Sequence, residues 1–175
     1  MKGSNPLSIK YYKQDVLIIA PDLVGKYLVV QKQDNTIGKY IITETEAYRG
    51  EEDLACHASK GRTKRTEIMY RAGGHIYVYM IYGMYWMLNV VTGKINEPQA
   101  VLIRGIKGYN GPGKLTKALH IDDSYNGKLL NQTTGIWIEE SEYKPELNIA
   151  TRIGIDYAGE IWKNKPWRFT LKKNT

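Results

Sequence analysis

The chain has 175 residues, 42% of them hydrophobic and 25% charged, which is the composition of a globular protein large enough to bury a core. No segment approaches the roughly 18 consecutive apolar residues of a membrane span, and the first residues lack the apolar stretch of a secretory signal, so we expect neither. The formal net charge of +7 favours a polyanionic partner, although solubility alone would also account for it, and a single cysteine, Cys56, excludes an internal disulfide.

The first half of the chain predicts one helix and two strands. Residues 15–23 read as a short helix that Pro21 interrupts or redirects and Gly25 ends. Strands are expected at residues 27–31 and 40–48, joined by a turn at residues 34–35. Residues 48–74 then form a long loop of charged and small residues, and loops of that length are usually functional or disordered.

The second half is richer in strands. Two tyrosine-rich runs, 75–82 and 84–92, are joined around Gly83, and a Gly-Pro-Gly turn at 111–113 precedes a helix at 114–120. Further strands are expected at residues 99–106, 136–139, 149–155 and 168–172. Because strands outnumber helices and hairpins connect them, we expect an α+β fold in one domain, with a curved, mainly antiparallel sheet and flanking helices.

Three side chains of the second predicted strand share one face. Glu44, Glu46 and Tyr48 alternate with the period of 2 that a strand imposes, and the long loop follows them directly. They are interpreted either as the wall of a site or as a solvated strand face. An ionised carboxylate in a site could polarise water.

The long loop contains a histidine and a basic cluster. No second His or Cys lies at metal-ligand spacing from His57, and the adjacent Cys56 has poor geometry for chelation. A zinc site is therefore not expected. A hydrogen-bonded structural histidine is the alternative to a role in a site. Arg62, Lys64 and Arg65 could contact phosphates.

The tyrosine-rich hairpin is the most unusual segment, in a chain with 14 Tyr and one Phe. Tyr77 and Tyr79 share one strand face, and Tyr82 lies at the tip beside Gly83. An exposed aromatic there could enter a base stack, or the tyrosines could form a core ladder. Asn89 and Arg104 are polar residues within apolar runs of the following strands, and each needs a partner if it is buried.

On these residues the sequence resembles the alkyladenine (3-methyladenine) DNA glycosylase family. The resemblance runs from about Asp15 to Phe169. Its most specific blocks are Glu-Thr-Glu-Ala-Tyr at 44–48 and Tyr-Val-Tyr-Met-Ile-Tyr-Gly-Met at 77–84. Further matches in chain order are Ala-Cys-His at 55–57, Gly-Arg-Thr-Lys-Arg at 61–65, Val-Leu-Ile-Arg at 101–104, Gly-Pro-Gly-Lys-Leu at 111–115, Arg-Ile-Gly-Ile at 152–155 and Lys-Pro-Trp-Arg-Phe at 165–169.

The resemblance implies a fold and a reaction. It implies a single domain over residues 1–175, similar to the C-terminal domain of formyltransferases, that needs no metal or cofactor. Glu46 would act as general base on the water that attacks C1′ of a flipped nucleotide, and Arg104 would help to hold this water. The enzyme would be monofunctional, without strand cleavage. We expect it to act as a monomer on double-stranded DNA that contains damaged purines, in the cytoplasm or, in a bacterium, at the nucleoid.

The resemblance also implies a binding mode. Tyr48 would stack on one face of the base and His57 with Tyr79 on the other, while Asn89 would disfavour guanine by crowding its 2-amino group. Tyr82 would fill the space that the flipped nucleotide leaves. DNA contacts are further expected from Arg62, Arg65 and Lys114.

The sequence departs from the family pattern in the basic loop, where Thr66 stands in place of the Asn of many relatives and Glu67 adds an acidic group. The substrates implied are 3-methyladenine, 7-methylguanine, hypoxanthine and ethenoadenine, and the departures leave open which of them is preferred. The alternative to an enzyme is a non-catalytic nucleic-acid-binding module of the same fold, in which Glu46 has no role. A hydrolase of free nucleosides would leave Tyr82 and the basic loop without a role.

Overall fold

Antiparallel strands form the frame of the protein. In the computed structural model, which describes residues 5–32 and 34–172, the central order is β3-β4-β5-β2-β1-β7. Every pair with a defined register is antiparallel. The strands are β1 (Tyr27–Gln31), β2 (Ile37–Arg49), β3 (Ile76–Ile81), β4 (Tyr85–Val91), β5 (Gln99–Ile106), β6 (Tyr109–Asn110), β7 (Ile136–Glu139), β8 (Leu147–Ala150) and β9 (Arg168–Leu171). The expected α+β fold with a mainly antiparallel sheet is confirmed.

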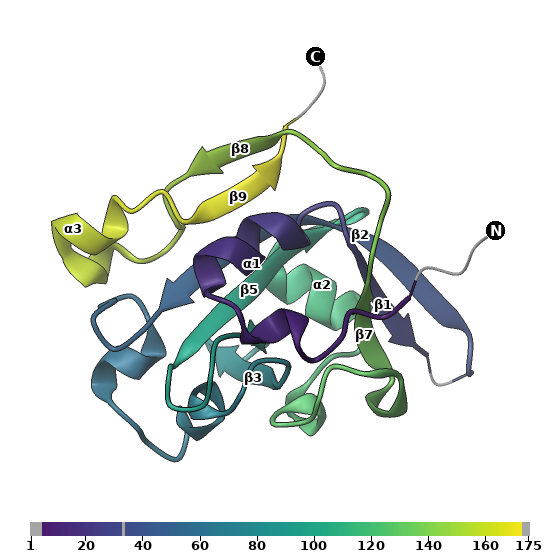
Figure 1. Cartoon of the computed structure of the whole chain (residues 1–175), viewed down its shortest axis with the longest axis horizontal. Helices are drawn as coiled ribbons and strands as arrows, with labels where there is room; N and C mark the ends of the chain where they lie inside the picture. The colour runs from purple at the N-terminus through teal and green to yellow at the C-terminus, as the bar shows by residue number, and fades with distance from the viewer. Residues whose placement is uncertain (1–4, 33, 173–175) are drawn as a thin grey trace.

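Strand β2 connects the two halves of the sheet. Its first residues pair with β1, while Ile42 and residues 44–49 pair with β5 and residues 44–46 also with β9. The register with β5 shifts on both sides of Glu44, and such bulges bend a strand. β8 and β9 form an antiparallel pair that joins the sheet through β9 and β2 (Figure 1). β2 is therefore longer than the strand predicted at residues 40–48.

Helix α1 (Val16–Leu23) begins where a helix cap is expected. The Asp15 side chain accepts the backbone N–H of Leu17 at 2.9 Å, and Gly25 follows the helix with a φ of +96°. Of the two effects expected of Pro21, interruption of the helix is wrong, because the helix continues through it to Leu23, and redirection stays a prediction. Burial of Ile19, Ala20 and Leu23 in the core outweighs the local cost of proline here.

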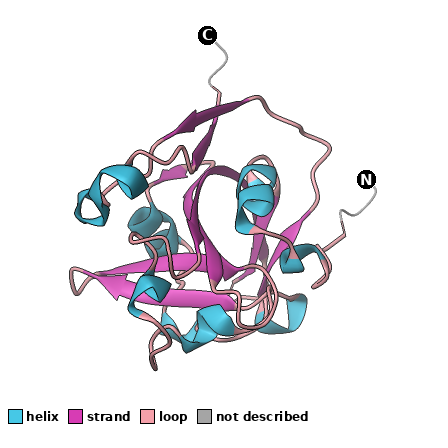
Figure 2. Ribbon diagram, turned by 60° about the vertical axis from the view of Figure 1, so that its left-hand side comes forward, coloured by secondary structure: helices cyan, strands magenta, loops and turns pink. Residues whose placement is uncertain are grey.

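Helix α2 (Pro112–Ala118) begins earlier than predicted. Proline is well suited to the first position of a helix, since its N–H is not needed there, so Pro112 starts the helix inside the predicted turn. The short helix α3 (Gly159–Lys163) was not predicted at all. The residues between β2 and β3 contain two 3-10 helices, His57–Lys60 and Glu67–Tyr70. Helical segments lie around the strands on several sides (Figure 2).

The strand predicted at residues 149–155 is wrong in its second half. β8 ends at Ala150, and Gly154 has a φ of +75°, which no strand residue adopts. The side chain of Arg152 turns inward to a buried ion pair with Asp53. Segment 152–155 is therefore irregular, and its residues 153–155 line a pocket described below.

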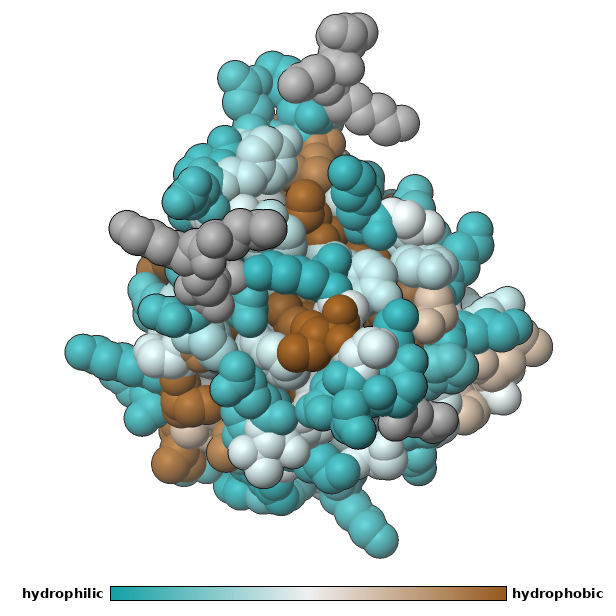
Figure 3. Space-filling model, turned by 90° about the vertical axis from the view of Figure 1, so that its right-hand side faces the viewer, coloured by the Kyte–Doolittle hydropathy of each residue, from teal (hydrophilic) through white to brown (hydrophobic). Residues whose placement is uncertain are grey.

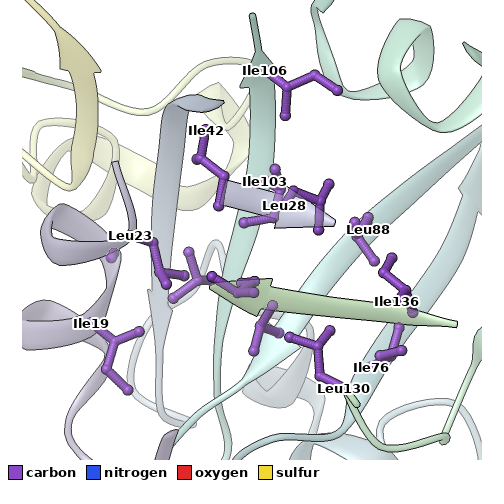
Figure 4. Packing of buried hydrophobic residues seen from close by; sticks show 14 of the residues in the cluster. Ile19, Leu23, Leu28, Ile42, Ile76, Leu88, Ile103, Ile106, Leu130 and Ile136 are labelled. Carbon is purple, nitrogen blue, oxygen red and sulfur yellow. The ribbon is translucent and has the colours of Figure 1, made fainter. Parts of the chain in front are cut away.

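The main core lies on one face of the sheet. α1 and α2 both contribute to it, and β5 contributes Val101 and Ile103. Figure 4 shows the labelled side chains of α1, β1, β2, β3, β4, β5 and β7 converging on this cluster. In β2, Thr45 faces the same side and donates its hydroxyl hydrogen to the carbonyl of Ala20 in α1 at 2.7 Å.

The outer surface is mostly polar. The face seen in Figure 3 carries small separate apolar patches among hydrophilic side chains, as ordinary protein surfaces do. Within the described residues, no helix is long and apolar enough to cross a membrane.

Candidate active site

A pocket of about 560 Å³ lies on the other face of the sheet. Strand alternation explains its position: in β5, Leu102 and Arg104 point into it, whereas Val101 and Ile103 point into the core. Seven of the predicted site residues line it, namely Tyr48, His57, Arg65, Tyr79, Tyr82, Asn89 and Arg104. They come from four strands (β2, β3, β4 and β5), a hairpin tip and the loop after β2. The fold therefore brings together residues up to 56 positions apart in the chain.

Glu46 is fully buried beside this pocket. Its Oε2 accepts the hydroxyl hydrogen of Tyr48 at 2.8 Å, and its Oε1 accepts the backbone N–H of Ile153 at 2.8 Å. Arg104 Nη1 lies 3.5 Å from Oε2. Burial raises the pKa of Glu46, and Arg104 and the two hydrogen bonds counteract part of that increase. The carboxylate is thus held in one orientation, with a proton affinity above the ordinary range.

A second carboxylate holds the arginine in place. Arg104 Nε donates to Glu44 Oε1 at 3.2 Å, and Arg168 of β9 donates to the same oxygen at 3.1 Å. Glu44, Glu46 and Tyr48 do point to one face of β2, as the alternation predicts. Among the described residues, Arg104 bridges the two carboxylates, which confirms that this polar residue within an apolar strand has ionic partners.

Aromatic rings form the walls of the pocket. The rings of His57 and Tyr79 lie 4.4 Å apart between centroids, and those of Tyr77 and Tyr79 lie 5.4 Å apart. His57 Nδ1 is 2.9 Å from the Tyr77 hydroxyl oxygen. Burial, with a smaller contribution from Arg65, lowers the pKa of His57 to about 4. The imidazole is therefore neutral at neutral pH and offers an uncharged ring to the pocket.

Asn89 lies on the floor between these walls. Its Nδ2 donates to the backbone carbonyls of Tyr77 and Met87, each at 3.2 Å. These two bonds fix the amide plane of a side chain that is only 2% exposed. No described residue donates to its carboxamide oxygen.

The tip of the β3–β4 hairpin carries Tyr82, which is 84% exposed. Tyr82 and Gly83 have φ values of +51° and +66°, and Met84 N–H donates to the Ile81 carbonyl at 3.1 Å. A left-handed conformation is uncommon for a tyrosine and costs backbone energy. The hairpin holds this ring out at the edge of the pocket in spite of that cost.

The basic residues predicted to contact DNA do not all lie at the pocket. Arg65 lines it, with its guanidinium carbon 5.2 Å from the Tyr79 ring centroid. Arg62 makes a two-pronged ion pair with Glu67, with both distances 2.7 Å, and also donates to Asn96. Glu67 thus neutralises part of the basic loop. Lys114 lies in the first turn of α2, two residues after the pocket residue Pro112.

Some residues of the site were not predicted. The sequence places Tyr77 only on the same strand face as Tyr79. Leu102 could have been predicted, because it lies two residues before Arg104 and so on the same face of its strand. Ile153 lies in the family-like block at 152–155 but was given no site role, and Tyr157 carries no sequence signal, because a segment from the far end of the chain places both at the pocket. The described residues contain no group of three or more acidic, histidine or cysteine side chains arranged to hold a metal ion.

An aromatic pocket beside a buried carboxylate, in a basic chain, is typical of hydrolases that act on a single base of DNA. Comparison with known proteins agrees with this class. The family model described as methylpurine-DNA glycosylase matches residues 10–110 and 107–175. A protein of Sodalis glossinidius that carries the name 3-methyladenine DNA glycosylase is 44% identical, over 97% of this chain and 98% of its own length.

Two further relatives with the same name are similar over comparable lengths. One, from Legionella pneumophila (strain Corby), is 42% identical over 94% of this chain and 93% of its own. The other, from Psychrobacter cryohalolentis, is 38% identical over 93% of this chain and 94% of its own. The chain therefore belongs to the methylpurine-DNA glycosylase family. It is a DNA N-glycosylase, a hydrolase of DNA repair that acts on alkylation damage.

Proposed function

We propose that the protein excises alkylated and deaminated purines, of the class of 3-methyladenine, 7-methylguanine, hypoxanthine and ethenoadenine, from duplex DNA. Hydrolysis of the N-glycosidic bond would begin base excision repair. The observation that carries the proposal is Glu46, a fully buried carboxylate oriented by three donors beside an aromatic pocket. A surface that only binds DNA has no need of such a group.

In the proposed reaction Glu46 takes a proton from a water molecule. The water oxygen forms a bond to C1′ as the C1′–N bond breaks, and the base leaves with the electron pair. The sugar passes through a state with oxocarbenium character, which the negative charge of Glu46 stabilises. Because burial raises the Glu46 pKa, the carboxylate is a stronger base than an exposed glutamate. Arg104, 3.5 Å from the carboxylate, would help to hold the water.

The base is proposed to bind between rings. Tyr48 would cover one face, and His57 with Tyr79 the other. Alkylation at N3 or N7 gives a purine a positive charge, which electron-rich rings attract. The neutral state of His57 supports this assignment, since a charged imidazole would repel such a base. The fixed amide of Asn89 is proposed to disfavour guanine by crowding its 2-amino group.

Tyr82 is proposed to enter the duplex and fill the space of the flipped nucleotide. Its 84% exposure at a strained turn supports the role, because insertion would bury a ring that water now surrounds. Arg65, Arg62 and Lys114 are proposed to contact phosphates, which would make binding dependent on salt. The described lining of the pocket includes no lysine, so no amine there supports strand cleavage through a covalent intermediate.

The test incubates the protein with duplexes that carry one hypoxanthine, ethenoadenine or 7-methylguanine, and with alkylated DNA. Alkaline heating then reveals abasic sites, and samples without alkali report any strand cleavage. We expect the native protein to release base and Glu46→Gln to lose at least about 100-fold in single-turnover rate, the scale of general-base catalysis. Glu160→Gln, which changes an exposed carboxylate of α3, is the matched control and should keep the native rate.

Two results would contradict the proposal. If lesion duplexes are bound but no lesion is processed, the protein is a binding module and Glu46 has no role as a base. If Glu46→Gln and Glu160→Gln have equal rates, the water is activated elsewhere.

A further inference from the structure

A buried ion pair behind the pocket wall has no part in the function proposed above. The side chains of Arg152 and Asp53 are both 0% exposed. Arg152 Nη1 lies 2.6 Å from Asp53 Oδ2, and Nη2 lies 2.9 Å from Oδ1. Because removing two charges from water costs so much, buried pairs are often no more stabilising than apolar side chains of the same volume. Stability alone is therefore a weak reason for this pair to be present.

Arg152 and the residue after it reach the site at three points. Its Nη1 donates to the carbonyl of Ala47, the residue between Glu46 and Tyr48, at 3.0 Å. Its guanidinium carbon lies 4.9 Å from the centroid of the Tyr48 ring. The next residue, Ile153, donates its N–H to Glu46 Oε1 at 2.8 Å. One side chain thus fixes the backbone that presents Glu46 and the segment that orients its carboxylate.

The remaining contacts hold the pair from the other side. Arg152 Nη2 donates to the carbonyl of Trp162 at 3.1 Å, and the Trp167 ring centroid lies 5.0 Å from the guanidinium carbon. Asp53 accepts backbone N–H groups from Arg49 at 3.2 Å and Ala55 at 3.1 Å. The pair joins the end of β2, the loop after it and the C-terminal segment.

We propose that Arg152 and Asp53 are a positioning pair for base excision and that Asp53 sets the preference for cationic over neutral purines. Arg152 holds Ile153 and the Tyr48 ring in position relative to Glu46. Asp53 neutralises the charge that Arg152 places behind that ring. This inference rests on the proposed function, because the cation that it concerns is the alkylated base.

Electrostatics gives the reason for the preference. A purine alkylated at N3 or N7 is positively charged and is attracted to the face of a tyrosine ring. An uncompensated guanidinium on the opposite face of the same ring would repel it, and a buried site screens this repulsion poorly. Hypoxanthine carries no charge and would not be repelled. Loss of the Asp53 charge therefore acts on one class of substrate more than on the other.

The experiment measures single-turnover rates at saturating enzyme on 7-methylguanine and hypoxanthine duplexes. We expect Asp53→Asn to lower the ratio of the 7-methylguanine rate to the hypoxanthine rate by about tenfold or more. The doubly neutral variant, Asp53→Asn with Arg152→Gln, should restore the native ratio within about threefold, because no charge remains behind Tyr48. Both of its rates should stay about tenfold or more below native, because the contacts of Arg152 are lost.

A ratio that does not change in Asp53→Asn would overturn the proposed preference, and native rates in the double variant would overturn the positioning role. If Asp53→Asn does not fold, the double variant still tests the positioning role, because it leaves no unpaired charge. Arg152→Gln with Asp53 intact then tests the opposite case, an unpaired negative charge behind Tyr48. Lys26→Met removes a buried lysine from its ion pair with Glu140, whose side chain is 51% exposed; this pair lies outside the pocket, so the variant should lower stability without changing the ratio. A native protein that excises neither base contradicts the proposed function itself, not this pair.

Discussion

The two faces of the same sheet make opposite use of neighbouring residues. On β5, Ile103 packs into the apolar core under α1 and α2, and the next residue, Arg104, bridges two carboxylates at the pocket. On β2, Thr45 ties the sheet to α1, and Glu46 lies buried on the pocket side. The core face stabilises the fold, whereas the pocket face buries polar groups that need partners. Adjacent residues of one strand therefore serve different purposes, one in stability and the next in the site. Substitutions at adjacent positions should accordingly change either the free energy of unfolding or the rate of excision.

The largest effect on stability is expected on the core face. Ile103→Ala should lower the free energy of unfolding by about 2–5 kcal/mol, because it leaves a cavity in a fully buried cluster. The single-turnover rate of the folded fraction should change by less than about threefold, since the side chain points away from the pocket. Denaturant unfolding and an excision assay below the transition measure the two quantities. A selective loss of rate without loss of stability would show that the faces are not separate.

The neighbouring position should behave in the opposite way. Arg104→Met keeps the aliphatic part of the side chain and should slow excision by about 100-fold, the scale on which a donor in an active site contributes. Because Arg104 lowers the Glu46 pKa, the acid limb of the pH–rate profile should also move to higher pH. A profile of rate against pH for both proteins measures this. An unmoved limb would mean that Glu46 is not the group that titrates.

Glu46→Gln should stabilise the protein at neutral pH although it removes activity. The folded pKa of Glu46 is raised above the ordinary value of 4.5, so the ionised form costs stability, and this cost grows as the pH rises from 4.5 through the folded pKa. The melting temperature of the variant should therefore exceed that of the native protein by a few degrees at pH 8 and by less at pH 4.5. Glu160→Gln, on the exposed side of α3, should show no such difference. Equal gains at both pH values would remove burial of the charge as the cause.

The smallest effect is expected from His57, and only in acid. Its folded pKa of about 4 lies below the ordinary 6.5, so the unfolded chain takes up the proton first, and the stability contribution is lost as the pH falls from 6.5 to about 4. His57→Gln should flatten the dependence of melting temperature on pH in that window. His75→Gln, for an imidazole bonded to the Ala72 carbonyl outside the pocket, is the control. A native slope that persists in His57→Gln would place the titrating group elsewhere.

Much of the site could be predicted from the sequence because it lies on regular strands. The period of 2 places Glu44, Glu46 and Tyr48 on one face and Tyr77 with Tyr79 on another, and the structure confirms both groupings. The tip position of Tyr82 follows from the glycine beside it. The catalytic and DNA-binding roles stay predictions, as do the single glycosylase domain and the likeness to formyltransferases.

What the sequence by itself determined is which side chains share a strand face and which family the chain resembles, since both depend on local order along the chain. Only the tertiary structure decided which residues far apart in the chain contact each other. The Arg152–Asp53 pair, the Ile153 N–H on Glu46 and the Arg62–Glu67 pair join residues whose spacing follows no helix or strand period. The first two contacts arise where irregular segments pack against the sheet and satisfy buried charges, whereas Arg62 and Glu67 pair at the exposed surface of the loop. Their partners are set by the shape of the whole fold, which no short pattern in the sequence encodes.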